Sequence, residues 1–164
     1  MASFDIVSKL DMGEMKNALD QALREIKGRY DFKGSQIEVT LKEAQNQIHL
    51  LAEDDYKLKA ALEILRKRMA GRGIGMKSIE PGPIEASGNQ MQKQVIDLKS
   101  GIDKDMGRVI NRLIKSSSFK VTSSYLDEKI RVQGKKIDDL QGIFQELRLH
   151  DDVKVELKME NMKS

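Results

Sequence analysis

The chain has 164 residues, 39% of them hydrophobic and 34% charged, so it is long and apolar enough to bury a packed core. Its 29 basic and 26 acidic side chains nearly cancel, which excludes a histone-like polycation. The absence of cysteine excludes disulfides, thiol nucleophiles and thiolate metal sites. The sequence shows no long apolar run and no signal-peptide pattern. We therefore expect a soluble, cytoplasmic protein with no membrane partner.

The first half of the chain shows the periodicities of strands and helices in turn. Residues 3–9 alternate in polarity, which predicts a half-buried strand. Apolar residues at spacings of three and four then predict a helix from Met12 to about Lys27, with Asp11 as its N-cap. The pattern continues with strands at 36–42 and 47–52, joined by a turn at "EAQN", and with a helix that opens at Asp54 and Asp55.

The second half repeats this pattern. An offset of 82 aligns the two central strands and the second helix with their counterparts, whereas the first helix repeats at an offset of 91. The first half therefore contains nine extra residues between its first helix and its next strand. The segment "GRYDFKGS", residues 28–35, occupies most of this insertion.

The repeating order of strand, helix, strand, strand, helix, strand is typical of a ferredoxin-like fold. We predict an α+β protein with two tandem ferredoxin-like (βαββαβ, RNP-like) domains, each an antiparallel sheet with two helices on one face. The predicted domains are residues 1–88 and 89–164, because both prolines and the Gly88-Asn89 turn signal interrupt the pattern at "SIEPGPIEASGNQMQKQ". An interleaved arrangement, in which the first strand crosses into the other half, stays open.

Strand alternation also predicts which side chains face away from the helices. In the C-terminal half this outward set is mostly basic, so it could contact phosphates, or it could simply keep the sheet face hydrated. The stacking aromatics of an RNA-recognition motif are absent from the central strands. The nucleic-acid-binding candidates on this face and beside it are Lys120, Lys129, Arg131, Lys135 and Lys136.

Other motifs argue against catalysis. "GRGIGMKS" lacks the spacing of a phosphate-binding loop and follows a helix, which favours a helix C-terminus with a left-handed Gly71 or Gly73. His49 and His150 have no metal-ligand spacing, and the paired acidic residues precede helices that they can cap. We expect no catalytic residue, no metal site, no cofactor and no enzymatic activity.

The inserted segment "GRYDFKGS" concentrates aromatic and basic residues. In an extended conformation, Tyr30 and Phe32 would lie on one side and Arg29, Asp31 and Lys33 on the other. Such a face could stack on a nucleobase, while a cation meets its phosphate. Alternatively, the two rings anchor the loop to the domain core.

Four segments resemble the successive signatures of the YajQ family of bacterial nucleotide-binding proteins: "ASFDIVSKLD", "GRYDFKGS", "KSGIDKDMGRVINRLIKSSSFKV" and "DEKIRVQGKKIDDLQ". The resemblance covers almost the whole chain. It implies a tandem RNP-like fold and a cytosolic, non-enzymatic nucleotide-binding protein. It also implies that the ligand is a nucleic acid or cyclic di-GMP, with a transcription regulator as a partner.

These observations lead to three hypotheses. In the first, the chain is a nucleotide-binding protein and a cyclic di-GMP receptor that acts through a partner. Its ligand residues are then Arg29, Tyr30, Phe32 and Lys33, near Ser3, Phe4 and Asp5 of the first strand. In the second, the chain is RNA-binding or ribosome-associated and uses the basic sheet face. In the third, it is a protein–protein adaptor that docks a partner on a sheet edge or open face.

Overall fold

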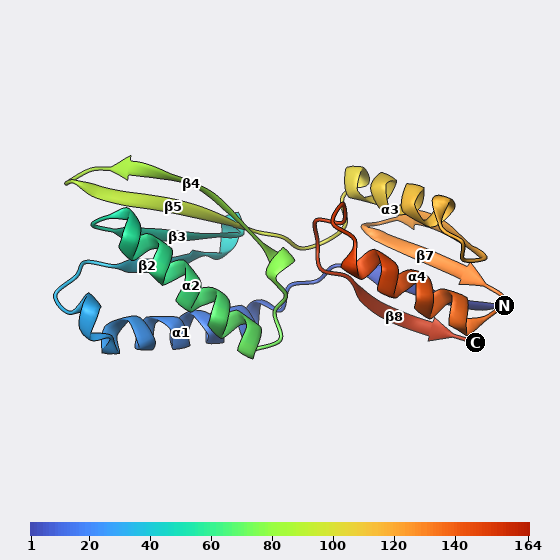
Figure 1. The fold of residues 1–164 in the computed structure, drawn as a ribbon. Coiled ribbons are helices and arrows are strands. Elements are labelled where there is room, and N and C mark those ends of the chain that lie inside the picture. The colour runs from blue at the N-terminus through green and yellow to red at the C-terminus, as the bar shows by residue number, and fades with distance from the viewer. The chain divides into compact units, whose positions relative to one another are not determined.

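The computed structural model describes residues Met1–Ser164 and contains two antiparallel four-stranded sheets and four α-helices (Figure 1). Each sheet carries two helices on one face, because alternate strand residues and one face of each helix are apolar and pack together. The predicted fold class, α+β with two ferredoxin-like units, is thereby confirmed. No helix is both long enough and apolar enough to cross a membrane.

Unit 1 comprises residues 1–9 and 100–164. Its sheet has the strand order β6-β7-β1-β8, in which the first strand of the chain lies between two strands from the second half. Its elements are β1 (Ala2–Val7), α3 (Lys104–Ser116), β6 (Val121–Leu126), β7 (Lys129–Gly134), α4 (Ile137–Leu149) and β8 (Lys158–Lys163).

Unit 2 comprises residues 10–99 and has the strand order β2-β3-β5-β4. Its last strand, β5, takes the position between two neighbours that β1 takes in unit 1. Its elements are α1 (Met12–Gly28), β2 (Glu38–Lys42), β3 (Gln47–Ala52), α2 (Asp55–Gly71), β4 (Ile79–Ser87) and β5 (Met91–Leu98). Single turns of 3₁₀ helix lie at Tyr30–Phe32, Glu43–Gln45 and Met76–Ser78.

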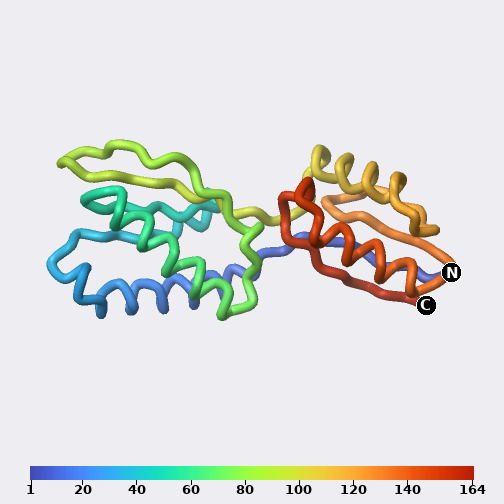
Figure 2. Tube along the Cα trace, viewed as in Figure 1, coloured from blue at the N-terminus to red at the C-terminus, as the bar shows by residue number.

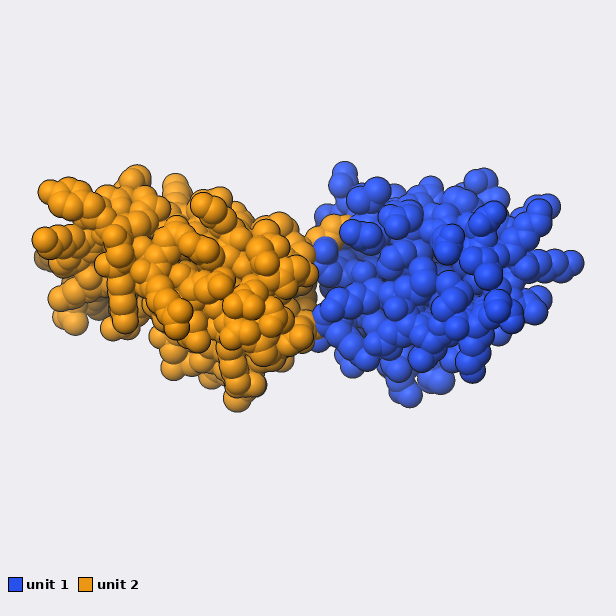
Figure 3. Space-filling model, turned by 90° about the horizontal axis from the view of Figure 1, so that it is seen from below, with its two compact units in different colours: residues 1–9, 100–164 blue, residues 10–99 orange.

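The two compact units differ from the predicted domains 1–88 and 89–164. Strand β1 pairs with β7 and β8, whereas β5 pairs with β3 and β4, so the interleaved alternative matches the strand pairing. The chain begins in unit 1, forms all of unit 2 and then returns (Figures 2 and 3). Periodicity located the first strand but did not reveal which sheet it completes.

The proline-containing segment is a strand and not a domain junction. Strand β4 contains both Pro81 and Pro83, and its pairing with β5 shifts register between Pro81 and Ile84. Because β4 is the outer strand of its sheet, a residue without an N–H can be accommodated there. The prolines mark a sheet edge, which explains why they interrupt the alternation.

Three of the four helices begin at an aspartate cap, whereas α4 begins at Ile137 without a side-chain cap and contains Asp138 and Asp139 in its first turn. The side chains of Asp11, Asp54 and Asp103 cap α1, α2 and α3 by accepting bonds from the backbone N–H groups of Glu14, Lys57 and Met106, respectively. At the end of α2, Gly73 adopts a φ of 76° and its N–H donates to the carbonyl of Ala70. The first residues of "GRGIGMKS" therefore form the C-terminal end of α2, as the sequence predicted.

Candidate functional site

The helix-free face of the unit 1 sheet brings together residues that the sequence placed in separate domains. Ser3 and Asp5 on β1 lie opposite Gln133 and Arg131 on β7. The alternate residue Phe4 points the other way, is 1% exposed and packs edge-on against Phe144 in the core, with 5.9 Å between ring centroids. Ser3 and Asp5 thus belong with the basic outward set, whereas the Phe4 ring is withdrawn from that face.

Asp5 and Arg131 form an ion pair at the centre of this face. Arg131 Nε donates to Asp5 Oδ1 at 3.0 Å, and Asn161 Nδ2 donates to Asp5 Oδ2 at 3.0 Å. The hydrogen bond from Arg131 is the main reason that the pKa of Asp5 lies below its usual value, although burial opposes this effect. The Asp5 side chain is 7% exposed and that of Arg131 is 55% exposed, so a buried carboxylate holds an accessible guanidinium.

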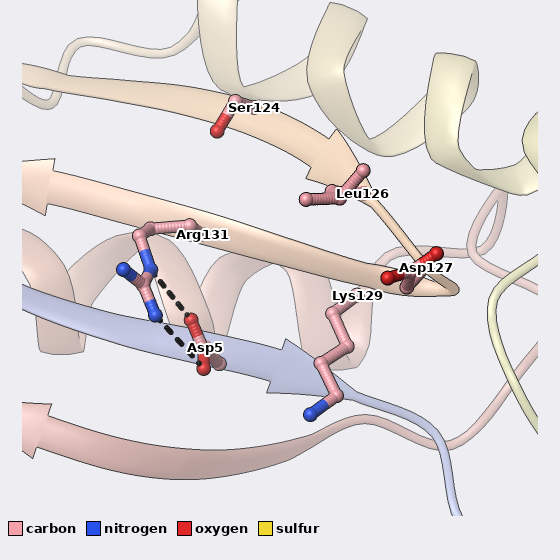
Figure 4. A pocket seen from close by; sticks show the side chains of 6 residues that line it. All are labelled: Asp5, Ser124, Leu126, Asp127, Lys129 and Arg131. Carbon is pink, nitrogen blue, oxygen red and sulfur yellow. Dashed lines mark hydrogen bonds and ion pairs between the residues drawn. The ribbon is translucent and has the colours of Figure 1, made fainter.

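A pocket of about 420 Å³ surrounds this ion pair (Figure 4). Arg131 and Lys129 project from β7, and Leu126, which is 74% exposed, supplies an apolar wall. Arg131 Nη1 has no protein partner. The pocket therefore offers free N–H donors beside an apolar surface. Its full lining is Asp5, Ser124, Leu126, Asp127, Lys129 and Arg131.

A second pocket of unit 1, of about 670 Å³, lies where β6 begins and β7 ends. Lys120, Lys135 and Lys136 line it, together with the apolar side chains of Phe119 and Val121. The five basic candidates from the sequence are therefore divided between two pockets. Lys129 and Arg131 belong to the first pocket, which we call the arginine pocket, and the three others to the second, the lysine pocket.

The segment "GRYDFKGS" is not extended, so the condition for a two-sided aromatic and basic face is not met. Residues Tyr30–Phe32 form a 3₁₀ turn, so the two rings do not share a side. Phe32 is 4% exposed and belongs to the core of unit 2, whereas Tyr30 is 90% exposed. The packing alternative therefore describes Phe32, and Tyr30 alone offers a ring to solvent.

Arg29 is engaged within its own turn. Its Nη2 lies 2.7 Å from Asp31 Oδ2, and its guanidinium carbon lies 4.7 Å from the centroid of the Phe32 ring. The hydrogen bond from Arg29 lowers the pKa of Asp31. Lys33 is exposed. The predicted ligand residues are thus divided: Arg29, Tyr30, Phe32 and Lys33 belong to unit 2, and Ser3, Phe4 and Asp5 belong to unit 1.

Sequence reasoning missed Asn161, which binds the carboxylate of Asp5. Asn161 lies in β8, which begins at Lys158. The apolar residues just before this strand, Val153, Val155 and Leu157, fill the core of unit 1. Asn161 itself has a φ of 55°, in the left-handed region that Asn tolerates, beside an irregularity in β1–β8 pairing. The polar, methionine-containing end "KMENMK" gave no clear signal for this strand.

These units define an α+β protein of the RNP-like class whose first sheet leaves one face open and partly basic. The chain belongs to the family described as nucleotide-binding protein YajQ-like, whose model matches residues 2–163. A nucleotide-binding protein of Geotalea daltonii is 48% identical over 151 residues, 92% of each chain. A nucleotide-binding protein of Geotalea uraniireducens is 44% identical over 163 residues, 99% of each chain. The resemblance inferred from the four sequence segments is confirmed.

Proposed function

We propose that the chain binds a nucleotide in the arginine pocket of unit 1 and does not catalyse its conversion. The observation that carries this proposal is the accessible guanidinium of Arg131, which buried Asp5 orients and whose Nη1 has no protein partner. Relatives along the full length of the chain are named nucleotide-binding proteins, which supports the same function.

In this proposal a phosphate of the nucleotide binds Arg131 and Lys129. A planar guanidinium that is already fixed on one side can donate two parallel bonds to phosphate oxygens with little further loss of side-chain entropy. Lys129 adds a second positive charge from the same strand. The phosphate would thus take the place of solvent on the free side of Arg131.

The base of the nucleotide packs against Leu126 in this arrangement, and Ser124 supplies a hydroxyl within the same lining. The rings of unit 1 are not in this lining, so aromatic stacking contributes less than in an RNA-recognition motif. Binding then depends mainly on charge and weakens as salt rises. The specific ligands that we propose are a cyclic dinucleotide, such as cyclic di-GMP, or a short single-stranded RNA.

A second candidate place for the same ligand is the exposed ring of Tyr30 in unit 2. Its 90% exposure and its position near Lys33 favour stacking of a base with a cation at hand. Arg29 and Phe32 would act there only indirectly, by fixing the turn through their mutual contact. The Tyr30→Leu variant tests this place.

Calorimetric titration at low salt tests the proposal. Wild type, Arg131→Gln and Tyr30→Leu are titrated with a mononucleotide, cyclic di-GMP and a short RNA. Arg108→Gln is the matched control, because Arg108 is an exposed arginine of the same unit outside both pockets. We expect at least one ligand to saturate and to lose about 10–100-fold affinity with Arg131→Gln, as loss of charge-assisted bonds implies. The bound ligand should be recovered chemically unchanged.

Each contrary result has a distinct meaning. Loss of binding in Tyr30→Leu but not in Arg131→Gln moves the site to unit 2. Equal affinities for wild type, Arg131→Gln and Arg108→Gln remove the arginine pocket from consideration. No saturable binding by any of the three ligands at low salt rejects nucleotide binding itself. Circular dichroism of each variant separates these results from a loss of folding.

A further inference from the structure

The outer strands of the two sheets differ in how well they are protected against pairing with another chain. An outer strand exposes unpaired backbone N–H and C=O groups, and charges, prolines or bulges normally prevent further pairing. Strand β4 carries Pro81 and Pro83 and a shift in register. Strand β8 has the irregularity at Asn161 and is rich in charged residues. Strand β2 has charged residues at both ends, Glu38 and Lys42.

Strand β6 has none of these protective features. Its six residues, "VTSSYL", include no proline and no charged side chain, and they pair with β7 in continuous register. Valine, threonine and tyrosine favour the extended conformation. Strand β6 is therefore an uncharged, regular outer strand on which a further strand could pair.

The conformation of β6 is fixed from the helix side. Tyr125 Oη donates to the carbonyl of Ile102 at 2.6 Å, and Ser123 Oγ donates to Asn111 Oδ1 at 2.7 Å. These two inward side chains tie the strand to Ile102, just before α3, and to the middle of α3. A strand that is already ordered loses little entropy on pairing, which favours binding.

The lysine pocket lies at the beginning of this same strand. Lys120, Lys135 and Lys136 line it without forming an ion pair, and Asp139 is the one acidic residue in the lining. Phe119 and Val121 add apolar surface beside the three ammonium groups. The positive charge of this lining is complementary to a carboxylate on a chain that continues along β6.

We propose that an extended, acidic segment of a partner protein adds as a fifth strand to the outer edge of β6, with acidic side chains in the lysine pocket. Backbone hydrogen bonds along β6, about 20 Å long, provide affinity, and the lysines select acidic sequences. This interaction uses the sheet edge, whereas the proposed nucleotide site uses the open face around Arg131. The proposal does not depend on nucleotide binding.

A fluorescent peptide of about six alternating valines and threonines, with a glutamate pair at each end, tests the proposal on the wild-type chain. Glutamates at both ends let either strand direction meet the lysines. One control peptide has lysines in place of glutamates, and another is N-methylated at alternate residues, which removes backbone donors. We expect the acidic peptide to shift the backbone amide NMR signals of Val121–Leu126. Each control should bind at least about tenfold more weakly.

Protein variants provide the matched comparison. Lys135→Glu with Lys136→Glu should reduce peptide affinity about tenfold or more. Lys104→Glu with Arg112→Glu, which makes the same charge change on exposed positions of α3, should not. Because the peptide controls use the unmodified chain, a variant that fails to fold does not prevent a decision.

Three outcomes would overturn the proposal. The first is a lack of strand pairing, seen either as unchanged β6 signals with the acidic peptide or as equal binding of the N-methylated peptide. The second is a concentration-dependent dimer with the same β6 shifts, which would assign the edge to a second copy of the chain. The third is a response of the lysine pocket to a short RNA and not to the acidic peptide, which would assign it to nucleic acid.

Discussion

Arg131 and Asp5 are 126 positions apart in sequence, yet Arg131 Nε lies 3.0 Å from Asp5 Oδ1 on adjacent strands. The carboxylate is almost fully buried and also accepts a bond from Asn161. One contact thus joins the first strand of the chain to a strand near its end and orients the arginine of the candidate site.

Asp5→Asn should lower the free energy of unfolding by about 1–2 kcal/mol at pH 7, because it removes a charge-assisted bond whose arginine is half exposed. The folded state holds the pKa of Asp5 below its ordinary value, so the unfolded chain takes up this proton first as pH falls. The difference in free energy of unfolding between wild type and Asp5→Asn should therefore have its full value well above about pH 4. It should shrink as the pH falls below about 4. Urea unfolding between neutral and acidic pH measures the difference.

Asp105→Asn is the control for this prediction. Asp105 also pairs with an arginine, Arg108, but its side chain is 88% exposed, so its loss should change stability by less than about 0.5 kcal/mol. A wild-type advantage over Asp5→Asn that persists unchanged into strong acid would contradict the role assigned to the Asp5 carboxylate.

Phe32→Ala should destabilise unit 2 by about 3 kcal/mol, because it removes a buried ring from the core and leaves a cavity. Tyr30→Ala, two positions earlier, should change stability by no more than about 0.5 kcal/mol, since its ring is in solvent. Chemical denaturation of the two variants makes the comparison. Similar losses for both would show that the turn is anchored by both rings.

Gly142→Ala should destabilise unit 1 even though alanine is the better helix former. A Cβ atom at Gly142 in α4 would overlap the ring of Phe119, and overpacking costs about 1–3 kcal/mol against a helix-propensity gain of about 1 kcal/mol. At Gly71 in α2 no atom lies within 4 Å of the corresponding Cβ. Thermal melts should therefore show a lower midpoint for Gly142→Ala and an unchanged or higher one for Gly71→Ala.

The fragment of residues 10–99 should fold independently, because it contains all four strands of its sheet and both helices. The fragment of residues 89–164, which matches the C-terminal domain expected from sequence, should remain unfolded in isolation. It lacks β1, the strand that pairs with both β7 and β8. The dispersion of amide NMR signals tests both expectations: it should be wide for residues 10–99 and narrow for residues 89–164. Addition of a peptide with the sequence of residues 1–9 should partly restore the dispersion of the second fragment.

Local structure was largely predictable from the sequence. Apolar spacing predicted a helix from Met12, and the acids before three helices act as caps, because both signals depend on residues within one turn. Alternation correctly placed Arg131 and Asp5 on outward strand faces. It could not pair them, because a period of two residues reports which face a side chain takes and carries no information about the neighbouring strand.

The inserted segment illustrates a second limit. Alternating rings and charges in "RYDFK" indicate a two-sided strand only if the backbone is extended, and the chain instead closes a 3₁₀ turn stabilised by Arg29 and Phe32. Burial of Phe32 in the core of unit 2 outweighs the local pattern. A tertiary contact therefore decides which of two neighbouring aromatic residues is available to a ligand.

The placement of β1 also has a consequence for synthesis on the ribosome. At about 5–20 residues per second, residues 10–99 are complete about 2–7 s before the end of β7 and about 3–13 s before the end of β8. Strand β1 stays unpaired until its neighbours β7 and β8 have been translated. Its apolar side chains stay exposed during this interval, and folding of unit 2 shortens the flexible path that β1 must later close.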